Sequence, residues 1–327
     1  MSERSDYMKV TEILQQAIDA KQTRFAFELL PPLKGENIST IFDTIDSLMP
    51  FDPAYINVTY HREDLKYVER PDGLLERRIV RKRPGTVGIS AAIMVRYGVE
   101  VVPHIICGGH SKYDLEDLLI EMEFLGIQNV LALRGDCLKG ENTFNPHPEG
   151  YAYAVELIRH IREMNNGTYA DCEIENCTPT DFCIGVAGYP EKHAQAPNKM
   201  TDIAHLKAKI DAGAEYVVTQ MFFDNAKYFE FVEDCRAAGI DVPIIPGLKP
   251  FSTKRQLNLL PQTFHVDLPE ALVAEVEKCK SNDEVRQVGI EWAVMQTREL
   301  KAAGVPVVHF YTMGKSDNVE KIAKEAF

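Results

Sequence analysis

Residues 129–136 read NVLALRGD, and this segment gives the clearest indication of the fold class. Its apolar run VLAL is too short for a helix and lacks polar alternation, which is typical of a strand buried on both faces of a parallel sheet. Arg134, Gly135 and Asp136 follow directly, where α/β proteins place their chemistry, and Gly135 lets a ligand approach the backbone closely. The alternative is an Arg–Asp pair that only closes the strand.

Seven other short apolar segments have the same character. At least one segment with helical apolar spacing separates each predicted strand from the next, so the connections are βαβ crossovers and the sheet is parallel. Eight parallel strands close into a barrel with a filled interior. We therefore predict an α/β fold, a (βα)8 TIM barrel that forms a single domain over residues 1–327. The other predicted strands span residues 25–30, 55–60, 99–107, 182–189, 216–223, 242–248 and 305–311.

Two segments interrupt the alternation of strands and helices. Residues 61–84 are charged and are predicted to be an irregular excursion from the barrel mouth, and residues 165–181 are predicted to be a polar loop insertion. Residues 8–21 carry apolar side chains at helical spacing, which predicts an amphipathic lead-in helix. Ser39 is expected to N-cap the helix that follows it, and a further helix is expected over residues 202–212.

The chain is acidic overall, with a formal charge of -13 from 36 basic and 49 acidic residues. This balance argues against a nucleic-acid or anionic-membrane partner, so an anionic ligand requires a local cluster of positive charge. One such cluster is a basic run in the first insertion, which is most often a solvated face; a role in binding an anion or substrate is the alternative. The run contains Arg77, Arg78, Arg81, Lys82 and Arg83.

The sequence indicates a soluble cytoplasmic protein. It has no apolar run of 18 residues, and its N-terminus lacks the apolar core of a signal peptide. The 7 cysteines are an odd number spread over a long chain, which favours reduced thiols over a disulfide framework.

Polar residues inside or just after the predicted strands indicate a site, because burying them is unfavourable unless they are paired or used. Glu28 is flanked by apolar residues and should be partly desolvated, which favours the neutral acid. Asp136 should stay ionised beside Arg134, so the two carboxylates can take different roles. The full set is Glu28, Thr59, His104, Arg134, Asp136, Tyr189, His193, Gln220 and His309.

No metal site or nucleotide motif is predicted. His104, Cys107 and His110 are spaced by three, but two glycines separate the last pair. The thiols of residues 172, 177 and 183 lack CxxC spacing. Neither GxGxxG after the first strand nor a P-loop occurs, so a cofactor would bind across the barrel mouth.

Taken together, the motifs FELLPP, NVTY, PHIIC, ALRGD, GYPEKH, DAGAEYVVTQMFFD, IIPGLKP and HFYTM closely resemble the methylenetetrahydrofolate reductase family. Their order and approximate spacing agree from about residue 25 to residue 315. The resemblance implies an FAD-dependent barrel that takes hydride from NADH or NADPH. It implies reduction of 5,10-methylenetetrahydrofolate to 5-methyltetrahydrofolate by a ping-pong reaction, which supplies methyl groups for methionine synthesis.

The resemblance also assigns roles to individual residues. Glu28 matches the general acid that opens the methylene bridge, and Asp136 matches a residue between flavin and folate. Gln220, Gln256 and Lys315 match substrate-binding positions, while Leu260 replaces an aromatic that stacks on the substrate. The matched flavin contacts are Thr59, Tyr60, His104, Arg134, Gly135, Asp136, Tyr151, Ala152, Tyr189, His193, Ala196, Asp202, His205, Ala208 and Lys209.

Two other functions remain open at this point. A flavin-dependent barrel related to the proline dehydrogenases would keep the fold and change the substrate. A folate- or flavin-binding module would bind its ligand without turnover. We expect small-molecule substrates and a homo-oligomer, and we expect no regulatory extension of the animal and fungal type because the chain ends soon after the last strand.

Overall fold

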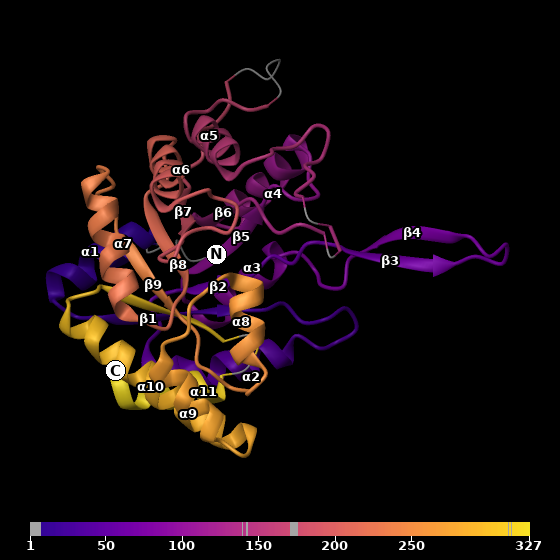
Figure 1. Cartoon of the computed structure of the whole chain (residues 1–327). Helices are drawn as coiled ribbons and strands as arrows, with labels where there is room; N and C mark the ends of the chain where they lie inside the picture. Colours follow the sequence, from indigo (N-terminus) through magenta and orange to yellow (C-terminus); the bar gives the residue numbers. More distant parts are fainter. Residues whose placement is uncertain (1–7, 139, 142, 171–175, 313, 315) are drawn as a thin grey trace.

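The computed structural model describes residues 8–138, 140–141, 143–170, 176–312, 314 and 316–327. Eight parallel strands form a closed barrel in the order β1-β10-β9-β8-β7-β6-β5-β2 (Figure 1). This arrangement confirms the predicted (βα)8 barrel and its eight strands. The strands are β1 (Arg24–Leu29), β2 (Ile56–Val58), β5 (Val101–Ile106), β6 (Asn129–Leu133), β7 (Cys183–Gly188), β8 (Tyr216–Met221), β9 (Ile244–Leu248) and β10 (Val307–Tyr311).

Helices connect successive strands and surround the barrel (Figure 1). Their apolar faces pack on the outward-facing strand residues in one large core. The helices are α1 (Val10–Ala20), α2 (Ser39–Leu48), the 3-10 helix η1 (Met49–Phe51), α3 (Val87–Tyr97), α4 (Lys112–Phe124), α5 (Ala154–Asn165), α6 (Lys199–Asp211), α7 (Asn225–Ala237), α8 (Gln256–Phe264), α9 (Glu270–Lys278), α10 (Asn282–Ala302) and α11 (Asp317–Ala326).

The predicted lead-in helix is present as α1 and closes the amino-terminal end of the barrel, which we call the floor. Val10, Ile13 and Leu14 pack with the inward-facing residues of the strands in a second core. Asn129, at the start of β6, is fully buried, and its Oδ1 accepts the N–H of Val10 at 2.8 Å. Its Nδ2 donates to the carbonyl of Met8 at 3.0 Å, so the side chain fastens α1 to the sheet.

The prediction of an irregular segment over residues 61–84 is wrong. Strands β3 (Asp64–Glu69) and β4 (Leu75–Val80) form an antiparallel hairpin that extends away from the barrel (Figure 1). Charged residues lie on both faces of this hairpin, so the apolar alternation that identifies a half-buried strand is missing.

One predicted N-cap and one predicted helix start are also wrong. Ile38, not Ser39, is the N-cap of α2, and the side chain of Asn37 accepts the N–H of Ser39 at 2.9 Å. Helix α6 begins at residue 199, three residues before the predicted start, because the side chain of Asn198 caps it by accepting the N–H of Thr201 at 2.9 Å. In both cases an asparagine side chain bonds near the helix start.

Candidate functional site

The carboxyl ends of the barrel strands, which we call the mouth, gather polar side chains from distant parts of the sequence. In the strand register Glu28 of β1 lies beside Tyr311 of β10 and Asn57 of β2. Thr59 continues this arrangement, since its N–H donates to the carbonyl of Leu29 at 2.9 Å. The predicted polar residues on or directly after the strands are Glu28, Thr59, His104, Arg134, Tyr189, Gln220 and His309.

Glu28 is a desolvated acid, as its apolar neighbours predict. Burial raises its pKa to about 7, and the Thr59 hydroxyl lowers the pKa by a smaller amount. His104 Nε2 lies 3.5 Å from Glu28 Oε2, but desolvation lowers the pKa of His104 to about 3. The contact therefore joins an uncharged imidazole to a carboxylic acid and is not an ion pair. A carboxyl group that keeps its proton up to neutral pH is suited to general acid chemistry.

Further polar atoms lie without partners inside the barrel. His309 is fully buried, and in the described part of the chain neither ring nitrogen has a hydrogen-bond partner. Desolvation lowers the pKa of His309 to about 3. The hydroxyls of Tyr55 and Tyr216 and the Oδ1 of Asn57 are likewise unpaired among the described residues. Such buried atoms ordinarily bond to ordered water, so the interior is built to hold polar molecules.

The segment Arg134–Asp136 turns away from β6 at the mouth. Gly135 has φ of 84°, and a Cβ atom there would lie 3.2 Å from the side chain of Ile106, so both backbone and space favour glycine. Arg134 Nη1 donates to Gln195 Oε1 at 2.7 Å. Within the described residues no ion pair joins Arg134 to Asp136, which counts against the alternative of a pair that closes the strand.

A second group of predicted residues meets at the end of β7. The rings of Tyr189 and His193 make an edge contact with centroids 4.7 Å apart, and the N–H of His193 donates to Asp202 Oδ2 at 2.9 Å. Lys209 Nζ donates to the carbonyl of Ala187 at 2.6 Å. Burial lowers the pKa of Lys209 to about 8, although Asp202 opposes the change. This group offers a buried amine and a carboxylate that can receive a phosphate and a hydroxyl.

The other predicted cofactor residues lie on loops and helices near this end of the barrel. The hydroxyl of Tyr60 lies 3.0 Å from His110 Nε2. The hydroxyl of Tyr151 lies 2.7 Å from His160 Nδ1 on α5, so it points into the helix layer. Ala152 precedes α5, Ala196 is buried in the loop after β7, and His205 and Ala208 are exposed on α6.

The predicted substrate residues make bonds within the protein. Gln220 Oε1 accepts the N–H of the next residue at 2.9 Å. Gln256, the first residue of α8, accepts the N–H groups of Ser252 and Thr253 at 2.7 and 3.1 Å. Their amide oxygens are therefore engaged, while their amino groups have no partner among the described residues and can donate to a ligand. Lys315 lies outside the described residues.

Leu260 is part of a core and not of the open mouth. It is 1% exposed and packs with Phe223, Phe251 and Val266 beneath α8. The resemblance matches Leu260 to an aromatic residue that stacks on the substrate, but in this protein Leu260 packs in a core.

Two residues that sequence analysis missed lie at the mouth. The hydroxyl of Tyr311 donates to the carbonyl of Thr219 at 2.6 Å. Lys249 follows β9 next to Tyr311 in the register, is 8% exposed, and has no partner in the described structure. Desolvation lowers the pKa of Lys249 to about 8. Side chains alternate between the two faces along β9, and Ile245 and Gly247 face inward. The same alternation places Lys249 inward, so this residue could have been identified from the sequence.

No group of three or more His, Cys, Asp or Glu residues that fits a metal ion occurs in the described ranges. The cysteines at 107, 137, 183, 235 and 279 are free thiols, and Cys172 lies outside the described residues. None of the helices that the structure describes combines the length and apolar character needed to cross a membrane.

Comparison with known proteins gives a consistent result. Residues 13–326 match the family described as "Methylenetetrahydrofolate reductase". The sequence is 32% identical over 330 residues to "Methylenetetrahydrofolate reductase (NADH) 1" of Arabidopsis thaliana, covering 97% of this chain and 50% of that protein. It is 31% identical over 297 residues to the 5,10-methylenetetrahydrofolate reductase of Salmonella typhimurium, covering 90% of this chain and 88% of that protein. The chain thus spans about half the length of the plant relative and most of the bacterial one.

A solved structure supports the fold alone. It has a TM-score of 0.52 and 13% sequence identity, and the match covers 96% of this chain and 97% of that chain. That protein is an uncharacterized protein from Clostridium thermocellum, described as binding two copies of 5-methyl-5,6,7,8-tetrahydrofolic acid.

Proposed function

The chain belongs to the methylenetetrahydrofolate reductase family, and we propose that it reduces 5,10-methylenetetrahydrofolate to 5-methyltetrahydrofolate with NADH or NADPH. The observation that carries this proposal is Glu28, a carboxylic acid with a pKa raised to about 7 at the barrel mouth. The matching position in the family holds the general acid. Membership and geometry therefore support the same residue for the same role.

The proposal includes FAD as the cofactor, and the residues at the mouth fit it. The fit rests on the desolvated Lys209 amine and on the positive φ of Gly135, which permits close approach. Lys209 and Arg134 would neutralise phosphate charge, and Asp202 would accept a hydroxyl. FAD, when bound, supplies hydride transfer between the nicotinamide and the folate.

We assign Glu28 the proton transfer to the folate. Methylenetetrahydrofolate carries its one-carbon unit in a ring that bridges two nitrogens, and protonation of one nitrogen lets the ring open to an iminium ion. Desolvation keeps Glu28 protonated to about pH 7, so its proton is available under neutral conditions. Asp136 would place negative charge beside the same ring system, and the Gln220 amino group would orient each substrate in turn.

Further parts of the proposal concern the whole protein. We propose that residues 1–327 act as one catalytic domain, that the reaction follows a ping-pong order, and that its product supplies methyl groups for methionine synthesis. We also propose a cytoplasmic location and a homo-oligomeric assembly. Small molecules are the proposed partners, in keeping with the net charge of -13.

Anaerobic stopped-flow absorbance of the flavin in the purified protein tests the proposal. NADH or NADPH should bleach the flavin, and methylenetetrahydrofolate added second should restore its colour. Bleaching without recovery would exclude folate as the acceptor. A colourless protein that binds no added FAD would contradict the proposal as a whole.

A further inference from the structure

The strand order divides the mouth into two halves. The matched flavin residues Thr59, Arg134 and Tyr189 follow β2, β6 and β7, which lie with β5 on one side of the closed barrel. Glu28 and Gln220 lie on β1 and β8, which β10 and β9 join on the other side. We call these two sides the flavin half and the substrate half. A ligand that reacts at Glu28 and contacts Gln220 must pass the ends of β9 and β10.

Lys249 lies at the centre of the substrate half. The register of β9 with β10, continued by one residue, places it beside Tyr311, which pairs in turn with Glu28 of β1. Tyr311 lies across β9, since its hydroxyl donates to the carbonyl of Thr219 on β8 and a Cβ at Gly247 would lie 2.7 Å from its ring. Lys249 is the next inward position of β9 toward the mouth. Its side chain therefore enters the mouth between the ends of β1 and β8.

Lys249 is a buried cation without a counter-ion. The residue is 8% exposed, and its amine has no hydrogen bond or ion pair within the described part of the chain. Desolvation lowers its pKa to about 8, and no described carboxylate opposes this change. The buried amine of Lys209 differs, because it donates to the carbonyl of Ala187 and the charge of Asp202 opposes the lowering of its pKa. At neutral pH Lys249 is therefore an ammonium group whose missing partner is an anion.

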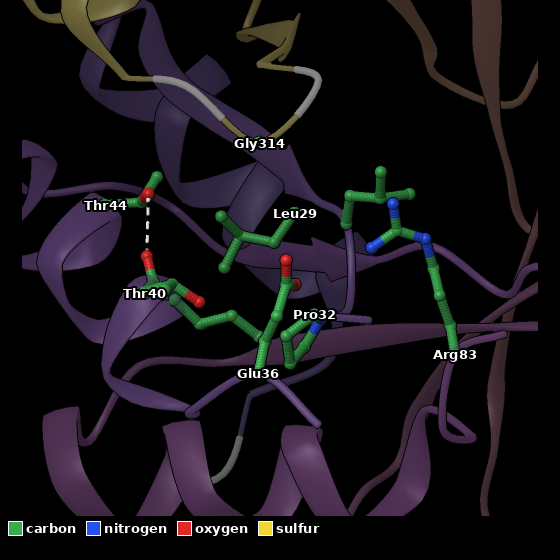
Figure 2. A pocket seen from close by; sticks show the side chains of 9 residues that line it. Leu29, Pro32, Glu36, Thr40, Thr44, Arg83 and Gly314 are labelled. Atoms are coloured by element: carbon green, nitrogen blue, oxygen red, sulfur yellow. Dashed lines mark hydrogen bonds between the residues drawn. The ribbon is translucent and has the colours of Figure 1, made fainter. Parts of the chain in front are cut away.

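The half-buried cation Arg83 offers a contrast on the outer side of the barrel. It lines a cavity of about 260 Å³ between β1 and α2, together with Leu29 and residues of α2 (Figure 2). Leu29 belongs to the core that packs the helices on the strands, and Glu28, which alternation turns inward, lines no part of this cavity. The Arg83 guanidinium donates to the carbonyl of Pro31. The barrel wall thus separates this cavity from the mouth, whereas Lys249 lies within the mouth.

The other polar groups of the substrate half supply no positive charge. Burial favours the neutral acid form of Glu28, and Gln220 and Tyr311 are uncharged. Lys249 is thus the cation among the described polar side chains at the carboxyl ends of these four strands. An anionic group of a ligand in the substrate half would complete it.

The nicotinamide nucleotides carry such an anion close to their reacting ring, because one ribose links the nicotinamide to the diphosphate. The pterin ring of the folate is uncharged, and its carboxylates lie beyond a benzoyl group. A lysine ammonium is a point charge that binds phosphate oxygens without the planar geometry that arginine imposes. We propose that Lys249 binds the diphosphate of NADH or NADPH in the substrate half, an inference that rests on the proposed function.

Stopped-flow reduction of the flavin-loaded full chain by NADH and by NADPH tests this proposal. In Lys249→Met the Kd for the nucleotide, obtained from the concentration dependence of flavin bleaching, should rise about ten- to hundredfold, as expected for one lost charge-assisted hydrogen bond. The limiting rate of bleaching should stay within about twofold, since the amine contacts the diphosphate and not the reacting ring. Lys249→Arg keeps the charge, so its Kd should be closer to that of wild type.

A reductant without phosphate isolates the proposed contact. N-benzyl-1,4-dihydronicotinamide has the reacting ring of NADH and no diphosphate, so it should reduce the flavin of wild type and of Lys249→Met at the same second-order rate. The Kd for methylenetetrahydrofolate in reoxidation of the reduced flavin should also be the same. Lys321→Met, at an exposed lysine of α11, is the matched control and should alter neither Kd. Retained flavin absorbance and thermal unfolding at or above the wild-type temperature confirm that Lys249→Met is folded.

The outcomes separate this inference from the proposed function. An unchanged Kd for the nucleotide in folded Lys249→Met would overturn the inference alone. A raised Kd for the folate in place of the nucleotide, or an equal loss of rate with the benzyl compound, would also overturn it. Flavin of the wild type that the nucleotide bleaches and the folate does not reoxidise would contradict the proposed function and leave the test of Lys249 intact. Flavin that neither nucleotide bleaches would remove both.

Discussion

Asn129 at the floor of the barrel differs from Glu28 and Lys249 at the mouth in how its buried polar atoms are satisfied. At the floor the buried side chain of Asn129 bonds to Val10, to Met8 and, at 3.3 Å, to Glu100. At the mouth Glu28 holds a proton because burial raises its pKa, and Lys249 is buried without a partner among the described residues. Both ends belong to the same eight strands.

This difference distinguishes groups that stabilise the fold from groups that are available for function. A buried polar group that has its hydrogen bonds stabilises the fold, whereas one without them destabilises it. Buried polar groups without hydrogen bonds are retained in proteins where a bound ligand supplies the missing partner. We therefore expect substitutions at the floor to lower stability and leave chemistry intact, and substitutions at the mouth to do the reverse.

The largest expected effect is on catalysis at the mouth. Glu28→Gln removes the proton donor and keeps the shape, so folate reduction should fall by about 10²–10⁴-fold, the usual contribution of general acid catalysis. Reduction of the flavin by NADH needs no acid from Glu28 and should be unchanged. Stopped-flow measurement of the two half-reactions checks this, and loss of both would contradict the assigned role.

A second effect is the pH dependence of stability at the mouth. The pKa of Glu28 is raised from 4.5 to about 7 in the folded protein, so its stabilising contribution is fully present below 4.5 and is lost as pH rises through 7. The loss should be on the order of 3 kcal/mol by about pH 8. Urea unfolding at one FAD concentration should therefore show Glu28→Gln gaining stability over wild type between about pH 5 and pH 8. An equal gap at both pH values would mean that Glu28 is not desolvated.

The matching change at the floor is Asn129→Ala. It leaves the N–H of Val10 and a carboxylate oxygen of Glu100 without this partner, so the free energy of unfolding should fall by about 2 kcal/mol. The kcat of the folded protein should not change. Gln15→Ala on the exposed face of α1 removes only a bond to Asp19 and should lower stability by less than about 0.5 kcal/mol. A fall in kcat for Asn129→Ala with an unchanged free energy of unfolding would contradict the structural role assigned to Asn129.

The smallest expected effect is a gain in stability at the mouth. Lys249→Met replaces a desolvated amine with an uncharged side chain of similar length, so the free energy of unfolding at pH 7 should rise by on the order of 1 kcal/mol. The gain should shrink above about pH 8, where the amine loses its charge. Lys321→Met, at an exposed lysine of α11, should change nothing. Destabilisation by Lys249→Met in urea unfolding would show that the lysine supports the fold.

Strand order and the barrel could be predicted from the sequence because they depend on local patterns. Short apolar runs separated by helical spacing occur eight times, and parallel strands with such connections close only in a few ways. Glu28 could be predicted in the same manner, since its apolar neighbours already imply desolvation. The hairpin of β3 and β4 could not, because charged side chains lie on both of its faces and none of its residues is buried in a core.

The amino-acid sequence by itself determined the (βα)8 fold, the family and the strand ends at which the polar residues lie. It did so because hydrophobic periodicity and motif spacing are properties of the chain alone. Only the tertiary structure decided which polar groups have partners. Arg78 and Arg83 look alike in the sequence, yet one is neutralised by Glu76 and the other faces a cavity. The reason is physical: the partner and the solvation of a charge depend on what the fold brings beside it, and the cavity wall comes from three distant segments of the chain.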